Sequence, residues 1–286
     1  MSGTPSVGET QLSQLVEARF ELAEGPQWFE HRWWWVDIES GSLYSCDPTG
    51  ASLWSRSFGQ RLSTFAPLGD DRFLLALQQG IAIWRRPLET LSFVAFPDAA
   101  VNDNRCNDGK LDPAGRFVVG TMSLSGQENA GGLYSLELPD KLTKRLSGVG
   151  CSNGLAWSHD GKTLFHVDSL SYTVKAYDYD LSTGAMGHPR TVVRVPKQFG
   201  LPDGMDIDPD GNLWVAHWDG WAVRCWSPEN GDCLAKISIP CARPTSCSFG
   251  GENFDQLLIT TARAGLSAEE LSKQPLAGGV FTCRVF

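Results

Sequence analysis

Four oxygen-bearing side chains occupy equivalent places in a repeated sequence pattern. Asn107, Asn153 and Asp203 each lie eight residues before the glycine of a polar turn, and Glu24 lies eight residues before the arginine of an earlier turn. The local sequences are EGPQW, NDGKLD, SNGLAW and PDGMDID. Because equivalent positions of repeats arranged around an axis point toward that axis, we expect these four side chains to converge.

Such a group of oxygen atoms suits a hard divalent cation. Ca²⁺, Mg²⁺ and Mn²⁺ prefer carboxylate and amide oxygens, and the same set of ligands also accepts Zn²⁺. The carboxylates of Glu24 and Asp203 would balance the charge of one such ion. A single Asn-Gly or Asp-Gly pair is also a common turn, but its recurrence in register favours a metal site. We therefore expect one divalent metal ion as the cofactor.

The elements that position these residues are short β-strands. A turn followed by an apolar run recurs six times, in HRWWWVDI, DDRFLLAL, AGRFVVGT, DGKTLFHVD, DGNLWVAH and NFDQLLIT. After each comes a second run, in GSLYSCD, GIAIWRR, GGLYSLE, YTVKAYDYD, WAVRCWS and GGVFTCRV. The turns recur roughly every 40 to 50 residues, as propeller blades do, and are marked by hairpin glycines. The pattern predicts an all-β protein, a six-bladed β-propeller with a central metal site.

The predicted propeller forms a single domain over residues 16–286, preceded by a flexible segment over residues 1–15. A propeller closes its ring, and the early LVEARFEL and the terminal GGVFTCRVF are both strand-like, so we expect them to share a blade. Helical character is confined to LSAEELSK, where Ser267 is the expected N-cap residue and Glu270 completes a capping box.

Composition narrows the possible partners. The net charge is −9 and the basic residues are scattered, so neither nucleic acid nor an anionic membrane is an expected partner. No apolar stretch has the roughly 18 to 20 residues of a membrane span, and the first residues lack an export signal, so we expect a cytoplasmic protein. Eight cysteines without CxxC pairs favour buried free thiols over disulfides. No feature indicates an oligomeric state.

Several ordered motifs resemble the SMP-30/gluconolactonase family. They are EGPQW, RCNDGKLDPAGRFVVGTM, SNGLAWSHDGK and PDGMDIDPDGNLWVA. The stretches DSLSYTVKAYDYDLSTG and TSCSFGGENFDQLLITTARAG are similar to the regucalcin-type members in particular. The likeness extends from about residue 24 to residue 281 and implies the same propeller fold.

The resemblance also implies an activity and roles for individual residues. Family members of this type open sugar lactones to sugar acids, which makes a carboxylic ester hydrolase with a small-molecule sugar lactone as substrate the expectation. By motif, Glu24, Asn153 and Asp203 correspond to the metal ligands, and Arg105 and Asn107 correspond to substrate contacts. The resemblance further implies that Asp203 acts as a general base or orients the attacking water.

The residue chemistry agrees with these roles. The Arg105 guanidinium can donate several hydrogen bonds to a developing oxyanion or a sugar hydroxyl, and the Asn107 amide offers both a donor and an acceptor to a polyol. A surface ion pair would be the structural alternative for Arg105, and turn capping the alternative for Asn107. Trp218 and Trp221 are candidates for a stacking wall, although packing within the blade is the more usual role of such residues.

One departure and three alternative functions stay open at this point. Regucalcin-type proteins carry acidic residues directly after GTM, where this chain reads SLSGQENAGG, so Ser125, Gln127 and Glu128 are candidate replacements. A non-enzymatic calcium-binding protein would bind metal without turnover. A propeller esterase or phosphotriesterase would need a less polar pocket than Arg105 and Asn107 suggest. A WD-type scaffold would give no reason for the metal ligands to lie in register.

Overall fold

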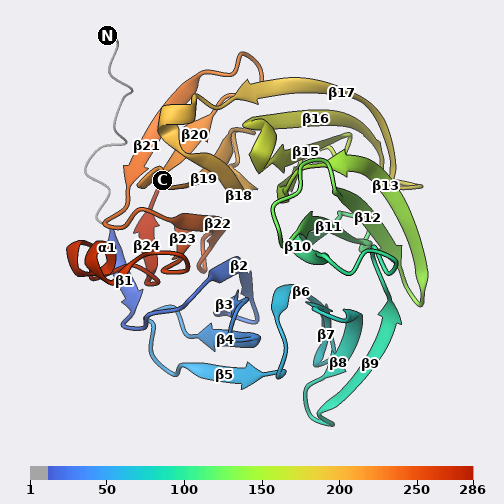
Figure 1. Cartoon of the computed structure of the whole chain (residues 1–286), viewed down its shortest axis with the longest axis horizontal. Coiled ribbons are helices and arrows are strands. Elements are labelled where there is room, and N and C mark those ends of the chain that lie inside the picture. The colour runs from blue at the N-terminus through green and yellow to red at the C-terminus, as the bar shows by residue number, and fades with distance from the viewer. Residues whose placement is uncertain (1–11, 286) are drawn as a thin grey trace.

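Six four-stranded antiparallel sheets surround a central axis (Figure 1). This computed structural model describes residues 12–285. Each sheet is one blade, and the inner strands of neighbouring blades contact one another around the axis. The predicted all-β, six-bladed β-propeller is therefore confirmed.

The first three blades follow one another along the chain, each beginning at its innermost strand. Their strands, from the axis outward, are β2 (Ala23–Phe29), β3 (Arg32–Asp37), β4 (Ser42–Cys46) and β5 (Trp54–Ser57); β6 (Leu62–Gly69), β7 (Arg72–Leu77), β8 (Gly80–Arg85) and β9 (Thr90–Ala95); and β10 (Asn104–Leu111), β11 (Phe117–Ser123), β12 (Gly131–Glu137) and β13 (Lys141–Val149).

The last three blades repeat this order, except that the sixth takes its outermost strand from the start of the chain. Their strands are β14 (Ser152–Trp157), β15 (Thr163–Asp168), β16 (Thr173–Asp180) and β17 (Ala185–Arg194); β18 (Leu201–Ile207), β19 (Leu213–Trp218), β20 (Ala222–Trp226) and β21 (Cys233–Ser238); and β22 (Pro244–Gly250), β23 (Gln256–Thr261), β24 (Val280–Arg284) and β1 (Ser13–Val16).

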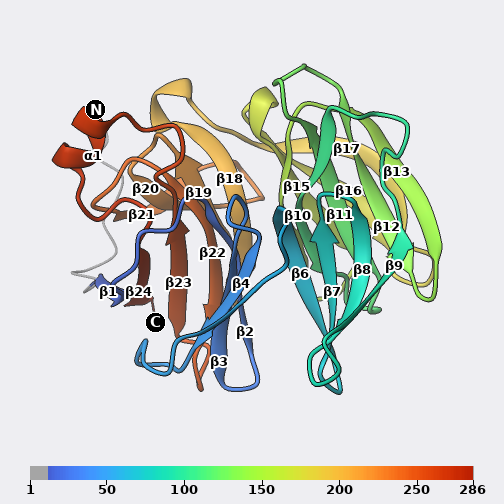
Figure 2. The same ribbon diagram turned by 60° about the horizontal axis from the view of Figure 1, so that its bottom comes forward.

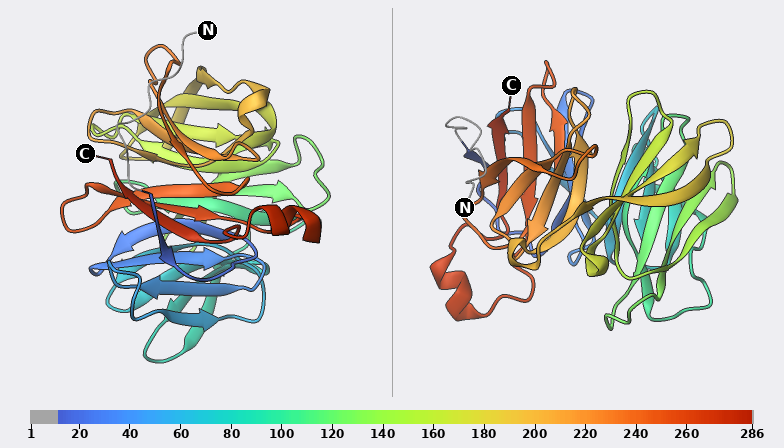
Figure 3. Two further views of the ribbon diagram at one scale, coloured as in Figure 1. Left: turned by 90° about the vertical axis from the view of Figure 1, so that its left-hand side faces the viewer. Right: turned by 90° about the horizontal axis from the view of Figure 1, so that it is seen from above.

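The sixth blade closes the ring in the predicted way. β1 pairs antiparallel with β24, with Val16 opposite Val280, so the two ends of the described chain share one sheet, as Figure 3 shows. β1 ends at Val16 and therefore includes only the first two residues of the predicted run LVEARFEL. It also begins within the segment predicted to be flexible, whose residues 1–11 lie outside the described part of the chain.

The six turn-and-run motifs form the second strand of each blade, and the runs after them form the third. These strands are largely apolar on both faces because each blade packs between two others; Figure 2 shows the blades in an oblique view. Trp33, Trp34 and Trp35 of β3 illustrate this packing. Trp34 belongs to a buried cluster shared with the second blade, whereas Trp33 and Trp35 belong to one shared with the sixth. Apolar burial between blades thus stabilises the ring.

Few residues of the described chain are helical. The 3₁₀ turns η1 (Ser169–Ser171) and η2 (Lys197–Phe199) lie in connections, and α1 (Ala268–Lys273) is a single short helix. Both hydrogen bonds of the predicted capping box are present, since the Ser267 side chain accepts from the Glu270 amide and the Glu270 carboxylate accepts from the Ser267 amide. The predicted helix start is confirmed.

All eight cysteines are free, six of them buried and Cys151 and Cys233 partly exposed. The expectation of free thiols is confirmed for all eight, and the expectation that they are buried is confirmed for six. Within residues 12–285, no helix has the length and apolar character needed to cross a membrane.

Candidate functional site

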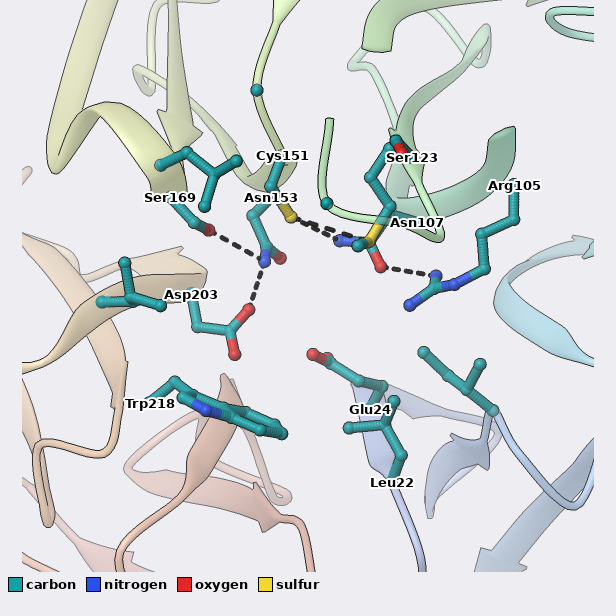
Figure 4. A pocket seen from close by; sticks show the side chains of 16 residues that line it. Leu22, Glu24, Arg105, Asn107, Ser123, Cys151, Asn153, Ser169, Asp203 and Trp218 are labelled. Atoms are coloured by element: carbon teal, nitrogen blue, oxygen red, sulfur yellow. Dashed lines mark hydrogen bonds between the residues drawn. The ribbon is translucent and has the colours of Figure 1, made fainter. Parts of the chain in front are cut away.

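The four sequence-predicted axial residues each lie at an irregularity in an inner strand. The pairing of β2 with β3 shifts after Glu24, and that of β14 with β15 shifts after Asn153. The register of β10 shifts across Asn107, and that of β18 shifts across Asp203. A bulge redirects a side chain that regular alternation would place against a neighbouring blade. These bulges turn the four polar side chains toward the axis (Figure 4).

The glycines that follow these residues allow the inner strands to approach closely. A Cβ atom at Gly154 would lie 2.8 Å from the carbonyl oxygen of Asp203, and one at Gly204 would lie 2.0 Å from Ser246 Oγ. A larger residue would push the blades apart at the point where the polar side chains meet. The Asn-Gly and Asp-Gly pairs therefore serve packing between blades rather than an isolated turn.

Two further residues complete the ring of equivalent positions, and the sequence reasoning missed them. Ser63 lies at the register shift of β6, and Thr245 lies at that of β22. The count of eight residues does not reach them, because Arg72 and Gln256, which begin β7 and β23 as Arg32 begins β3, lie further along the chain; only the register shifts identify them. Thr245 Oγ1 donates a 2.6 Å hydrogen bond to the carbonyl of Ala23 in the neighbouring blade.

The axial side chains lie on the wall of a cavity of about 250 Å³. Figure 4 shows the Glu24, Asn153 and Asp203 side chains pointing into a common space, with Arg105 and Asn107 on its other side. All five predicted site residues line this cavity, and each is buried. The structure thus brings together residues from four blades.

The amide of Asn153 is only half satisfied by the protein. Its Nδ2 donates to Asp203 Oδ1 and to Ser169 Oγ at 3.2 Å, whereas its Oδ1 is buried and has no hydrogen-bond partner. Glu24 Oε2 accepts a 2.9 Å hydrogen bond from the Gly25 amide. A buried acceptor without a donor is costly, and a cation beside it removes that cost.

The carboxyl group of Asp108 lies close enough to those of Glu24 and Asp203 for its charge to act on both. Burial, followed by the charges of Asp203 and Asp108, raises the pKa of Glu24 well above its usual value. Burial and the charge of Asp108 likewise raise the pKa of Asp203 well above the usual range. Burial raises the pKa of Asp108 to about 6, although Lys110 opposes the shift. Arg105 compensates only part of this negative charge, and a divalent cation would compensate the rest.

The donor set therefore fits a hard divalent cation. Glu24 and Asp203 supply carboxylate oxygens, and Asn153 Oδ1 supplies an amide oxygen without another partner. Within residues 12–285, no cluster of three or more His, Cys, Asp or Glu side chains has the spacing of a metal site. The candidate site consequently depends on the amide of Asn153 as its third ligand.

Arg105 and Asn107 form a bonded pair. Arg105 Nη1 donates to Asn107 Oδ1 at 2.7 Å and to the Cys106 carbonyl at 2.8 Å. Asn107 Nδ2 in turn donates to the Ser152 carbonyl at 2.9 Å. Asn107 therefore engages both ends of its amide within the protein and orients Arg105, while it still lines the cavity; its predicted contact with a substrate stays a prediction. The alternative of a surface ion pair does not hold for the buried Arg105.

The loop after GTM contributes differently from the prediction. The cavity wall includes Ser123 and Gly126 of this loop, but none of Ser125, Gln127 and Glu128. Ser125 Oγ instead donates to the Asp103 carboxylate at 2.7 Å. This hydrogen bond stabilises the conformation of the loop.

The two candidate tryptophans occupy different positions relative to the cavity. Trp218 lines the cavity, whereas Trp221 does not and is 46% exposed. Trp218 thus lies where a stacking wall would be, and Trp221 does not. His217, directly before Trp218, is fully buried, and its Nε2 accepts a 3.3 Å hydrogen bond from Trp226 Nε1, which is a structural role.

Known proteins resemble this chain in sequence and in fold. Regucalcin of Gallus gallus is 39% identical over 280 residues, covering 92% of this chain and 90% of that protein. A luciferin-regenerating enzyme superposes with a TM-score of 0.90 at 28% identity, covering 96% and 95% of the two chains. A structure described as a calcium-binding protein, regucalcin, from Agrobacterium tumefaciens has a TM-score of 0.90 at 26% identity, covering 94% and 92%.

The family model described as the SMP-30/Gluconolactonase/LRE-like region matches residues 22–263, which contain all five predicted site residues. With this match and the extended identity to regucalcin, the chain belongs to the SMP-30/gluconolactonase/LRE-like family.

Proposed function

We propose that this chain is a carboxylic ester hydrolase that opens a lactone to its hydroxy acid, with sugar lactones as the class that the sequence predicts. The observation that carries the proposal is the convergence of Glu24, Asn153 and Asp203, with one unpartnered amide oxygen, on a cavity that also contains a buried guanidinium. Family membership supports a hydrolase of this type.

Glu24, Asn153 and Asp203 would hold one divalent metal ion, and Ca²⁺, Zn²⁺, Mg²⁺ and Mn²⁺ are all compatible with oxygen ligands. Such an ion, when bound, polarises the acyl carbonyl and makes a neighbouring water more acidic. The pairing of two carboxylates with one amide keeps the net charge of the loaded site near zero, apart from Asp108.

The side chains of the chain itself hold and move the reactants. Asn153 Nδ2 fixes one oxygen of Asp203, which leaves the other oxygen to orient the attacking water and accept its proton. Arg105, held in place by Asn107, donates hydrogen bonds to the developing oxyanion. Water adds to the acyl carbon, the ring C–O bond breaks, and the proton passes to the departing alkoxide, which gives the open hydroxy acid.

The test is proton release, followed with a pH indicator, from D-glucono-, D-xylono- and D-galactono-lactone. Chelator-treated protein receives Ca²⁺, Mg²⁺, Mn²⁺ or Zn²⁺ separately, and turnover above the spontaneous rate should require one of these ions. Metal binding measured by calorimetry without turnover of any lactone, aryl ester or phosphotriester would contradict the proposal and favour a calcium-binding protein.

One observation also favours a related propeller esterase as a second candidate. The cavity wall carries several apolar side chains, including Leu22, Leu201 and Trp218, and the pocket is thus less polar than the sequence predicts. Hydrolysis of phenyl acetate or of a phosphotriester, with lactones left intact, would support this alternative.

A further inference from the structure

The polar groups of the cavity are largely committed to one another. Asn107 uses its amide on Arg105 and on the Ser152 carbonyl. Ser123 Oγ binds the Asp103 carboxylate and accepts the Gln127 amide at 3.0 Å. These bonds leave few hydrogen-bonding groups for the hydroxyls of a ligand.

The metal ligands make this shortage more severe. Glu24 and Asn153 would direct their remaining oxygens to the cation, and Asp203 would direct its remaining oxygen to the cation and its water; Ser169 Oγ accepts from Asn153 and keeps its own hydroxyl hydrogen. The remaining N–H groups of Arg105 and the hydroxyl of Ser169 are then the main side-chain donors left for a substrate. The acyl oxygen of the substrate takes up part of them.

The rest of the wall is apolar. Six side chains from the first, third, fourth and fifth blades line the cavity: Leu22, Ile38, Met122, Leu170, Leu201 and Trp218. In Figure 4, Leu22 lies next to Glu24, and the Trp218 ring lies next to Asp203. A substrate whose acyl group reaches the polar residues therefore places the rest of its ring against carbon.

The Trp218 ring is held firmly in this wall. The Arg243 guanidinium lies 4.7 Å from the ring centroid, and Arg243 Nε donates to Asp219 Oδ1 at 2.7 Å. A cation over an aromatic face restricts the ring. The carbon atoms of the Trp218 ring therefore present a fixed apolar surface to the cavity.

This surface discriminates between hydroxylated and alkylated rings. A hydroxyl placed against carbon loses its hydrogen bonds to water without replacement, whereas each buried methylene strengthens binding about fourfold. A sugar lactone carries several hydroxyls, and the cavity offers partners for few of them.

We infer that the preferred substrate is a lactone whose ring carries an alkyl or aryl substituent in place of most of the hydroxyls of a sugar lactone. The inference rests on the proposed lactone hydrolysis and narrows its substrate class. The specificity residues would be Leu170, Leu201 and Trp218, on the wall beside the metal ligands.

The experiment compares two six-membered lactones substituted at the same ring carbon. D-Glucono-δ-lactone carries a hydroxymethyl group and three ring hydroxyls, whereas δ-nonalactone carries a butyl chain and none. With the most active metal, we expect kcat/KM for δ-nonalactone to exceed that for the sugar lactone by roughly tenfold or more. An equal or reversed ratio would overturn the inference while leaving lactone hydrolysis intact.

Binding of the corresponding lactams separates specificity from catalysis, because lactams resist hydrolysis. Calorimetry should show 6-butylpiperidin-2-one binding at least roughly tenfold more tightly than D-glucono-δ-lactam. This preference would stand even if neither lactone were turned over, in which case only the proposed function would fail. Equal or tighter binding of the sugar lactam would overturn the inference.

A matched pair of leucine variants locates the effect on the wall. Leu170 lines the cavity and is 41% exposed, while Leu234, on the outer strand β21, is 38% exposed. Leu170→Ser should reduce the preference for the butyl compounds several-fold, and Leu234→Ser should leave it unchanged. Neither site is buried, so both variants should fold. An unchanged preference in Leu170→Ser would contradict the assignment of this wall.

Discussion

Two buried aspartates of the fifth blade, five residues apart, have opposite surroundings. Asp208 is 2% exposed and accepts hydrogen bonds from the Asn212 amide at 2.8 Å and from Trp214 Nε1 at 2.9 Å, among others. Asp203 is 6% exposed and faces other carboxylates across the cavity, with the Asn153 amide as its main partner. Burial alone therefore does not distinguish a structural acid from a functional one.

The difference lies in what compensates the charge. The turn around Asp208 supplies donors from its own backbone and from the next strand, so the carboxylate is satisfied when the blade folds. Asp203 has the Asn153 amide as its main donor, and burial together with the charge of Asp108 raises its pKa. Uncompensated buried charge is typical of a site that awaits a ligand or performs chemistry.

The largest expected effect is the loss of activity on removal of Asp203. Asp203→Asn should lower kcat/KM roughly a thousandfold, because it removes both a metal ligand and the group that orients water. Calorimetry should show loss of metal affinity, and the melting temperature of the metal-free protein should stay equal or rise, since an uncompensated charge is removed. Normal turnover by the metal-free variant would refute the mechanism.

Asp208→Ala should have the opposite effect, a loss of stability with little loss of activity. It leaves the Trp214 indole N–H and several backbone amides without an acceptor, at an expected cost of about 3 kcal/mol in the free energy of unfolding. Urea denaturation measures this loss, while kcat/KM of the folded fraction should stay close to wild type. A thousandfold loss of activity at full stability would remove the distinction between the two aspartates.

Arg105→Ala should reduce turnover and spare the metal. We expect kcat/KM to fall about a hundredfold, because the developing oxyanion loses its charged donor, whereas metal affinity measured by calorimetry should change little. Arg105→Lys is the matched variant and should recover part of the loss. If Arg105→Ala abolished metal binding, Arg105 would belong to the structure of the ion site instead.

The smallest expected effect is on acid stability, through a third buried ionisable group of the same blade. Burial lowers the pKa of His217 to about 3 from 6.5. Between these values the unfolded chain binds more protons than the folded one, so the stabilisation present above pH 6.5 is lost as the pH falls. Between pH 7 and pH 4.5 the loss from His217 is about 2 to 3 kcal/mol.

Urea denaturation across this pH range tests the contribution of His217. His217→Gln should flatten the pH dependence of the unfolding free energy. His31→Gln, at a position whose side chain is 80% accessible, is the matched surface variant that controls for the substitution itself. Identical slopes in wild type and His217→Gln would contradict the assignment.

Local sequence was sufficient for the fold and for the identity of the axial residues. The alternation of apolar residues has a period of two, and each hairpin turn is marked by local residue types, so six copies of one blade are readable without tertiary information. The constant distance of eight residues to the turn placed Glu24, Asn107, Asn153 and Asp203 at one level of the ring. Ser63 and Thr245 depart from this spacing, and only the register of their strands places them in the ring.

Only the tertiary structure decided how these residues are used. Asn107 is bonded to Arg105 and to the next blade, whereas Asn153 keeps a free oxygen, although both asparagines look alike in sequence. Trp218 faces the cavity and Trp221 does not. The apolar wall combines side chains that are far apart along the chain, such as Leu22 and Leu201. Periodicity predicts which residues are buried, but which of them face a common cavity depends on bulges and on contacts between blades.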